Sequence, residues 1–477
     1  AGVKIGILDS GIDQTHPAFQ DAGLAMPAGF PKCVGSDCTY TSNKVIAARS
    51  FVDSLVYLFE TDTRPDDLSP RDRVGHGTAA AMLAAGRAMQ GPGSSVTGIA
   101  PKAYLGNYKV FGSPGINDFS DDLAIIRGLE AALADGMDIV SMSLGQAAVW
   151  APNDRGTICG KTGQTACDIQ VEAVENAIRA GMVVVASAGN DGDVGGKIPT
   201  RNSISSPGSA PSAITVGATT NSRVLVQTVR VEGGPETLQQ INARFGTGSK
   251  VLAVNPSPMV DVAGLDGNGK ACDALGTGAL AGSVALVLRG DCSFLTKLRN
   301  AERAGALGVV VYQASSNGVF VATGLEGTTI PLLVIGNRDG LALKQYLTTT
   351  PGARVGFDVA LRPVNATADD MAIFSSQGPS IGDALIKPEL VAVGTDVYVA
   401  TQNYDPNGDM FDVSRYRSVE GTSFSAPMVA GAVAMVKQRN PGLAPAWLKS
   451  AVVNTADPRI TDFDYQDRAI DARTVAM

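Results

Sequence analysis

The sequence contains very little histidine. Only His16 and His76 occur among its 477 residues. Acid–base chemistry near neutral pH most often uses an imidazole, whose unperturbed pKa lies near ~6.5. His16 precedes Pro17 in a loop-like stretch, which favours a surface or structural role. His76 lies between Gly75 and Gly77 and opens an alanine-rich run that predicts a buried helix. We therefore expect His76, at the start of that helix, to face a cleft.

The sequence also lacks a long apolar run and a block of basic residues. A membrane-spanning helix needs about 18 or more consecutive apolar residues, and no such stretch occurs, so we expect no membrane span in this chain. Lys and Arg number 38 against 46 Asp and Glu, which gives a formal charge of -8. A mildly acidic chain without a basic patch is a poor candidate for nucleic-acid binding. We therefore expect no nucleic-acid partner.

Six cysteines are present, an even number with short separations. They fall into three local pairs: Cys33 with Cys38, Cys159 with Cys167, and Cys272 with Cys292. Such pairs favour disulfides and an oxidising compartment, and hence a secreted or cell-surface protein. A metal site is the alternative, but no pair has C-x-x-C spacing and neither histidine is near a cysteine in the sequence.

The first half of the chain alternates short apolar strands with helical segments. The expected strands are Val3–Leu8, Ala103–Val110, Ile139–Ser143, Val183–Ala186 and Ala213–Val216, and the expected helices are Gly77–Gly86, Asp121–Asp135 and Ile169–Ala180. Continuously apolar strands with helices between them are typical of a parallel sheet covered on both faces. The fold class is therefore α/β, and ligands are expected at the carboxyl ends of the strands.

This alternation stops after residue 223 and resumes near residue 362. The intervening residues 224–361 have their own strands, Val284–Leu288, Val309–Tyr312 and Leu332–Ile335, and two helices, Phe294–Ala304 and Gly340–Leu347. A segment with its own core reads as an inserted domain. We predict a discontinuous first domain, 1–223 and 362–477, interrupted by a smaller α/β domain, 224–361.

Three further polar residues occur where chemistry would need them. Asp9 ends the first strand and would point into the crevice, although Asp-Ser-Gly is also turn chemistry. Ser423 precedes an apolar, small-residue helix, and Pro427 fits within its first turn. The alternative role for Ser423 is a helix N-cap. Asn190 follows an apolar strand in a glycine turn, where a simple turn is the alternative.

These residues could act together as a nucleophilic site. A serine hydroxyl is a weak nucleophile until a base takes its proton, and His76 would be that base for Ser423. Asp9 would hold the imidazole in the required tautomer. The helix N-terminus and the side-chain amide of Asn190 would donate hydrogen bonds to a developing oxyanion.

The order Asp9, His76, Ser423 is that of subtilisin, and the surrounding strings resemble the subtilase family of serine proteases. The matching strings are Ile7-Leu8-Asp9-Ser10-Gly11-Ile12-Asp13, Gly75-His76-Gly77-Thr78, Ala188-Gly189-Asn190 and Gly421-Thr422-Ser423-Phe424-Ser425-Ala426-Pro427. The resemblance implies a subtilisin-like fold, an Asp-His-Ser triad at Asp9, His76 and Ser423, and an oxyanion-hole asparagine at Asn190. It also implies that Ser143, Leu144 and Gly145 line the substrate cleft, where a side chain at Gly145 would obstruct the peptide.

The inserted segment resembles a protease-associated (PA) domain, chiefly over Leu280–Gln313 and Ile330–Ile335. Family precedent links such a domain to substrate access or protein contacts. The resemblance implies protein or peptide substrates and no required cofactor. Many relatives bind structural calcium, but the sequence assigns no ligands, and the loop acids Asp66, Asp67 and Asp72 are equally explained as solvated charges.

Two other classes compete with the endopeptidase prediction. A surface binding or adhesive protein could keep the protease fold and use the PA domain for recognition, but it would not need all four polar groups. A different serine hydrolase, such as an esterase, predicts a Gly-x-Ser-x-Gly elbow with histidine last in chain order. Ser423 lies in Gly-Thr-Ser-Phe-Ser, and His76 comes before it.

Overall fold

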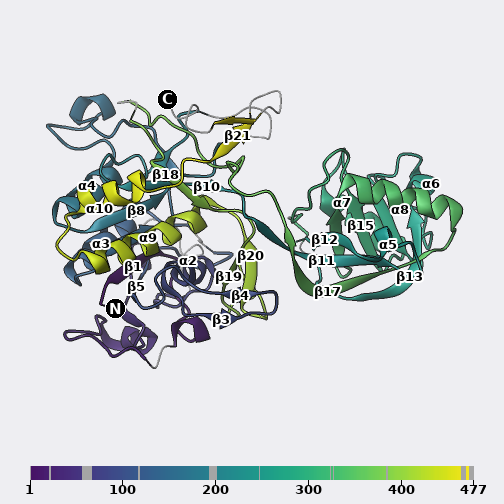
Figure 1. Ribbon diagram of the computed structural model, residues 1–477, viewed down its shortest axis with the longest axis horizontal. Helices are drawn as coiled ribbons and strands as arrows, with labels where there is room; N and C mark the ends of the chain where they lie inside the picture. The colour runs from purple at the N-terminus through teal and green to yellow at the C-terminus, as the bar shows by residue number, and fades with distance from the viewer. Residues whose placement is uncertain are drawn as a thin grey trace. The chain divides into compact units, whose positions relative to one another are not determined.

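The computed structural model describes residues 2–20, 23–55, 67–116, 119–192, 201–246, 248–322, 324–325, 327–382, 385–463 and 469–471. Asp66, one of the acids considered above, lies outside these ranges. The chain folds into two compact units, Ala1–Val224 with Asn365–Met477, and Leu225–Val364 (Figure 1). The second unit ends at Val364 rather than at 361, because its last strand, β17 (Arg354–Asn365), continues to that point.

A parallel sheet forms the centre of the first unit. Its strand order is β18-β10-β8-β6-β1-β5-β2, and every neighbouring pair is parallel. The strands are β1 (Lys4–Asp9), β2 (Val45–Ser50), β5 (Tyr104–Lys109), β6 (Ile139–Met142), β8 (Val183–Ser187), β10 (Ile214–Thr219) and β18 (Leu390–Val393). The five strands expected from the sequence are all present, and β2 and β18 are the two edge strands that the apolar pattern did not reveal.

Helices cover both faces of this sheet, as the sequence predicts. One face packs against α2 (His76–Ala85), α9 (Thr422–Arg439) and α10 (Pro445–Asn454), of which α9 and α10 are yellow in Figure 1. The other face packs against α3 (Asp122–Ala134) and α4 (Ile169–Arg179). The inner strands are buried on both faces, which explains their continuous apolar character.

Short elements complete the first unit. They are the 3-10 turns Pro17–Phe19, Gly35–Tyr40, Val52–Ser54 and Gly156–Cys159, and the two-stranded pairs β3 (Met89–Gln90) with β4 (Ser95–Val96), β7 (Gln146–Ala147) with β9 (Ser205–Ser206), β19 (Val397–Ala400) with β20 (Tyr416–Val419), and β21 (Thr461–Phe463) with β22 (Ala469–Asp471). Two of these turns carry the disulfides Cys33–Cys38 and Cys159–Cys167. The third disulfide, Cys272–Cys292, lies in the second unit.

His16 is a buried structural residue. Its Nδ1 accepts a hydrogen bond from the Ala18 N–H at 3.1 Å and thereby caps the turn that follows. Burial, together with the charge of Arg415, lowers the pKa of His16 to about 4. An imidazole that stays neutral in this position supports the fold.

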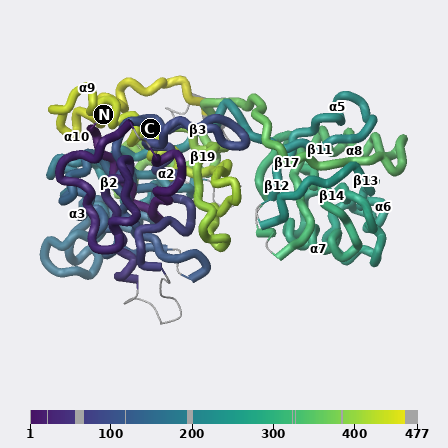
Figure 2. The backbone as a smooth tube through the Cα atoms, turned by 90° about the horizontal axis from the view of Figure 1, so that it is seen from below, coloured from purple at the N-terminus to yellow at the C-terminus, as the bar shows by residue number. Residues whose placement is uncertain are grey.

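The second unit is a closed barrel with the strand order β11-β12-β16-β15-β14-β13-β17. Its remaining strands are β11 (Arg223–Val231), β12 (Ile241–Phe245), β13 (Val254–Asp261), β14 (Val284–Leu288), β15 (Gly308–Tyr312) and β16 (Leu332–Ile335), and its helices are α5 (Glu236–Gln239), α6 (Ala263–Asp266), α7 (Phe294–Arg303) and α8 (Asn337–Thr349) (Figure 2). The parallel run β13-β14-β15-β16 contains the three strands expected from the sequence. Antiparallel pairings of β11 with β12, β12 with β16 and β13 with β17 extend this sheet into the barrel.

Candidate active site

Three neighbouring strands bring polar residues to one edge of the first unit's sheet. Asp9 is the last residue of β1, Ser143 follows β6, and Asn190 follows β8. These strands are adjacent in the order β8-β6-β1. The chain returns from β5, on one side of β1, to β6 on the other, so the sheet order reverses at β1. Open parallel sheets bind ligands at the carboxyl ends of their strands at such a reversal.

His76 is the first residue of α2, as the sequence predicts. Gly75 before it has φ 103°, and a Cβ there would lie 2.8 Å from the Met410 Cβ. Gly77 after it packs still more tightly, since a Cβ would lie 2.1 Å from the Gly11 carbonyl oxygen. Gly77 therefore lets the start of α2 lie directly against the loop that follows β1, while Gly75 lets it approach Met410.

This close approach joins His76 to Asp9. The His76 Nδ1 lies 2.8 Å and 3.0 Å from the two carboxylate oxygens of Asp9. The Asp9 side chain is 1% exposed and the imidazole 26%, so the pair is buried on the aspartate side and open on the histidine side. Burial lowers the pKa of His76, but the charge and hydrogen bond of Asp9 raise it, and the net result is a pKa above the ordinary histidine value. This geometry holds the proton on Nδ1 and directs Nε2 away from the carboxylate.

Ser423 is the second residue of α9, and the first turns of α9 and α2 meet, with the Phe424 and His76 rings 5.2 Å apart. The Ser423 Oγ donates its hydrogen bond to the Ser143 carbonyl oxygen at 3.4 Å. Among the described residues no hydrogen bond joins the Ser423 Oγ to His76. In unliganded sites a hydrogen bond between nucleophile and base is often long and shortens only when substrate binds.

Asn190 is exposed and is oriented by the start of the same helix. Its Oδ1 accepts hydrogen bonds from the N–H and the Oγ1 of Thr422, both at 3.0 Å. Because the oxygen is held there, the Nδ2 donor points the other way. No hydrogen bond from Nδ2 occurs within the described part of the chain, so this donor is available for a ligand.

Of the three substrate-cleft residues expected from the resemblance, Ser143 and Leu144 are buried and Gly145 is exposed. The reason for glycine at position 145 lies within the chain itself. A Cβ on Gly145 would lie 2.9 Å from the Ser205 Cβ and 3.0 Å from the Ser206 carbonyl oxygen. Crowding against β9 thus already favours glycine here, and the expected crowding against a bound peptide stays a prediction.

The model of the subtilase family matches residues 1–473 of the chain. The chain belongs to the subtilase family. It is 29% identical over 514 residues to the PII-type proteinase of Lactococcus lactis subsp. cremoris, an alignment that spans 99% of this chain and 25% of that protein. It is 28% identical over 468 residues to the minor extracellular protease Vpr of Bacillus subtilis, spanning 95% of this chain and 48% of that protein.

The chain therefore spans between a quarter and about half the length of these two relatives. Among solved structures, the psychrophilic subtilisin-like protease Apa1 from the Antarctic psychrotroph Pseudoalteromonas sp. AS-11 aligns with 95% of this chain and 87% of its own, with 16% identity and a TM-score of 0.48.

One residue of this subtilase site has a different role from the one expected. Asp72 is fully buried rather than solvated. Its carboxylate accepts hydrogen bonds from the Ser10 Oγ at 3.0 Å, the Gly75 N–H at 2.8 Å and the Thr78 N–H at 2.9 Å. Burial raises the pKa of the Asp72 carboxyl, against the effect of these donors. Asp72 thus connects the loop after Asp9 to the start of the His76 helix. The sequence offered little indication of this role, because Asp72 lies in an irregular segment.

Pro427 also lies elsewhere than expected. It is the sixth residue of α9, beyond the first turn in which it was placed. At that position a proline removes a hydrogen bond that an ordinary helical residue would make.

Within the described ranges, no three His, Cys, Asp or Glu side chains converge so as to hold a metal ion. Structural calcium stays a prediction of the resemblance, without assigned ligands. None of the described helices is both long and apolar enough to cross a membrane.

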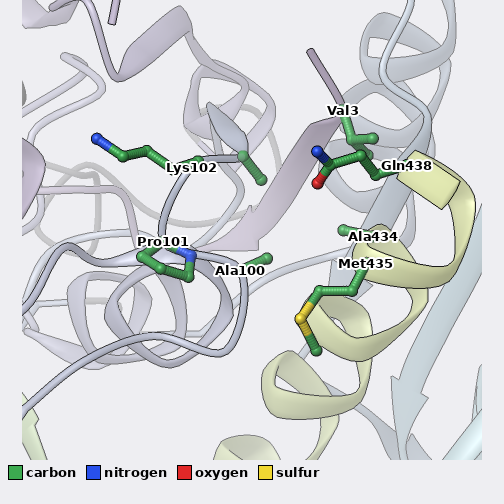
Figure 3. Close-up of a pocket in the computed structure, with 8 residues that line it drawn as sticks. Val3, Ala100, Pro101, Lys102, Ala434, Met435 and Gln438 are labelled. Atoms are coloured by element: carbon green, nitrogen blue, oxygen red, sulfur yellow. The ribbon is translucent and has the colours of Figure 1, made fainter. Parts of the chain in front are cut away.

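A cavity of about 280 Å³ lies away from the candidate site. It lies beside the start of β1, whereas Asp9 is at the end of that strand, and Met435 points into it from α9 while Lys102 points away (Figure 3). Its lining residues are Val3, Ala100, Pro101, Lys102, Ala103, Ala434, Met435 and Gln438.

Proposed function

We propose that this chain is the catalytic region of a secreted serine endopeptidase that acts through Asp9, His76 and Ser423. The observation that carries the proposal is the His76 Nδ1 held by both Asp9 oxygens, at 2.8 Å and 3.0 Å, on the helix whose first turn meets that of Ser423. A buried carboxylate behind a partly exposed imidazole is the arrangement that fixes the tautomer of a general base.

In the proposed reaction the Ser423 hydroxyl turns from the Ser143 carbonyl to the Nε2 of His76. His76 takes the proton, and the Oγ attacks the carbonyl carbon of the peptide bond. The resulting oxyanion accepts hydrogen bonds from the Asn190 Nδ2 and from the Ser423 N–H, which lies in the first turn of α9 and has no intrahelical acceptor. The partial positive charge of the helix N-terminus favours the same negative charge.

The collapse of this intermediate releases the amine. His76 gives its proton to the leaving nitrogen as the C–N bond breaks, and the acyl group remains on Ser423. Water then attacks the acyl carbon while His76 takes a proton from it, and the acid product leaves with Ser423 restored. These steps use side chains, backbone N–H groups and water, so the proposal requires no cofactor.

We also propose that Ser143, Leu144 and Gly145 line the cleft for an extended protein or peptide substrate. Gly145 is exposed and lies two residues after Ser143, whose carbonyl oxygen accepts the hydrogen bond of the Ser423 hydroxyl. An extended peptide recognised there would pair through its main chain.

Secretion is supported by the three disulfides, which form and persist in oxidising compartments. For the barrel Leu225–Val364 we propose a PA domain that governs substrate access or protein contacts.

The proposal is tested by the intact mass after treatment with a fluorophosphonate probe, on the wild type and on Ser423→Ala. One adduct on the wild type and none on the variant is expected, because only an activated serine reacts with the probe. Cleavage of a denatured protein, measured in parallel, separates a peptidase from an esterase. A folded wild type that forms no adduct would contradict the proposal and favour the binding protein.

A further inference from the structure

Helix α9 contains a proline that disturbs its own first turns. In an α-helix the N–H of each residue donates to the carbonyl oxygen four residues earlier. Pro427 has no N–H, and the carbonyl four residues before it is that of Ser423. The backbone of the proposed nucleophile therefore lacks the helical hydrogen bond that would fix its carbonyl group.

A side chain from the sheet supplies the missing donor. The Ser143 Oγ donates a hydrogen bond to the Ser423 carbonyl oxygen at 2.7 Å. Ser143 is 4% exposed and directly follows β6, a strand against which α9 packs. A carbonyl oxygen that loses its only donor in the protein is less stable, so this hydrogen bond stabilises the first turns of α9.

We propose that Ser143 is a positioning residue for Ser423, whose hydroxyl replaces the helical hydrogen bond that Pro427 removes. This inference rests on the proposed function. It is distinct from a contact of Ser143 with substrate, because its partner is the carbonyl of the nucleophile itself. The hydrogen bond to this carbonyl fixes the orientation of the Ser423 backbone. The backbone in turn sets the direction of the Oγ and of the N–H that would donate to the oxyanion.

The proposal predicts a change in turnover rather than in substrate affinity. A nucleophile displaced by about 1 Å can lose about 100-fold in rate. We expect Ser143→Ala to lower kcat about 10- to 100-fold with KM changed less than about threefold.

Ser141→Ala is the matched control. Ser141 lies two residues earlier in β6, is equally buried, and its Oγ has no hydrogen-bond partner among the described residues. Kinetics like those of the wild type are expected. A loss in this control equal to that of Ser143→Ala would show that any buried serine of the strand matters, and would overturn the proposal.

The decisive experiment combines Ser143→Ala with Pro427→Ala. Alanine at 427 restores an N–H that can donate to the Ser423 carbonyl, so the serine hydroxyl becomes dispensable. In the Pro427→Ala background, Ser143→Ala should lower kcat less than about threefold. An equal loss in both backgrounds would mean that Ser143 acts by another route, and the proposal would be wrong.

A second readout keeps the inference separate from the proposed function. Amide hydrogen exchange of peptides covering the first half of α9 is measured on the same four proteins and on Ser141→Ala. Faster exchange is expected in Ser143→Ala alone and not in the double variant. If the wild type is folded but inactive, the proposed function fails while the exchange cycle still decides the hydrogen bond. If exchange in Ser143→Ala equals that of the wild type, the inference fails whatever the activity.

Discussion

Both units of this subtilase contain parallel strands flanked by helices, but their carboxyl edges differ in what the polar groups do. In the second unit the polar groups after β14, β15 and β16 bind one another. The Gln313 Nε2 donates to the Gly318 carbonyl at 2.8 Å, its Oε1 accepts from Arg289, and the Asn337 Nδ2 donates to the Gln313 carbonyl at 2.8 Å. These side chains hold loops.

Among the described residues of the first unit, the side chains of Asn190 and His76 each form hydrogen bonds through only one of their two polar atoms. Asn190 is held through its oxygen and His76 through its Nδ1. Each therefore keeps one ring or amide nitrogen directed away from the residue that orients it. A parallel sheet edge can therefore offer polar atoms to a ligand when each polar group is oriented by one atom and left available at another.

The largest expected effect comes from removing the nucleophile or the base. Ser423→Ala or His76→Ala should lower kcat by at least about 10⁴-fold, a size taken from subtilisin itself. Circular dichroism should show an unchanged fold. The control is Arg289→Ala, which follows β14 in the second unit and should leave kcat unchanged. Residual turnover above about a tenth of the wild type in either site variant would contradict the assigned triad.

A substitution at Asn190 can remove the Nδ2 donor while keeping the oxygen that orients the side chain. Asn190→Asp keeps an oxygen to accept from the Thr422 N–H and Oγ1 but removes the Nδ2 donor. Loss of one oxyanion donor costs about 10²- to 10³-fold in kcat, again a value from subtilisin. The measurement is kcat on a peptide substrate, with the thermal midpoint as a check on folding. An unchanged kcat would remove Asn190 from the oxyanion site.

The third prediction concerns the buried hydrogen bonds of Asp72, which join the loop after Asp9 to the start of α2. Asp72→Ala leaves the Gly75 and Thr78 N–H groups and the Ser10 hydroxyl without their buried acceptor. The free energy of unfolding should fall by about 3–5 kcal/mol, measured by urea denaturation. Asp67→Ala, whose carboxylate accepts only from the nearby Ser69 N–H among the described residues, should change it by less than about 1 kcal/mol. Similar losses in the two variants would show that the buried network has no special value.

The smallest effect concerns the pH dependence of activity. A general base must be neutral, so activity is lost as the pH falls below the pKa of His76. Because that pKa is raised, the acid limb of kcat/KM should lie above the ordinary histidine value. The charge of Asp409 contributes to the rise, so Asp409→Asn should move this limb to lower pH by less than about one unit. A limb that moves to higher pH would contradict this electrostatic assignment.

Much of the architecture was predictable from local sequence. Apolar runs such as Val183–Ala186 are buried strands because both faces of the sheet are covered, and their pattern shows this directly. The edge strand β18 was missed because its residues are only half-buried and carry no such pattern. The barrel was only partly predicted because β11, β12, β13 and β17 pair antiparallel or close the sheet, and these pairings leave a weaker signal than parallel core strands.

The sequence by itself determined which residues are candidates for the chemistry and in what order they occur, since two histidines and four distinctive strings restrict the choice. It also determined that the first unit is an α/β sheet. Only the tertiary structure decided the burial of Asp72, the contact that makes Gly145 necessary, and the hydrogen bond from Ser143 to the Ser423 carbonyl. The physical reason is the range of each interaction. Helix and strand periodicity is written in neighbouring residues, whereas these three features join segments distant in the chain, and their geometry follows from how the strands and helices pack.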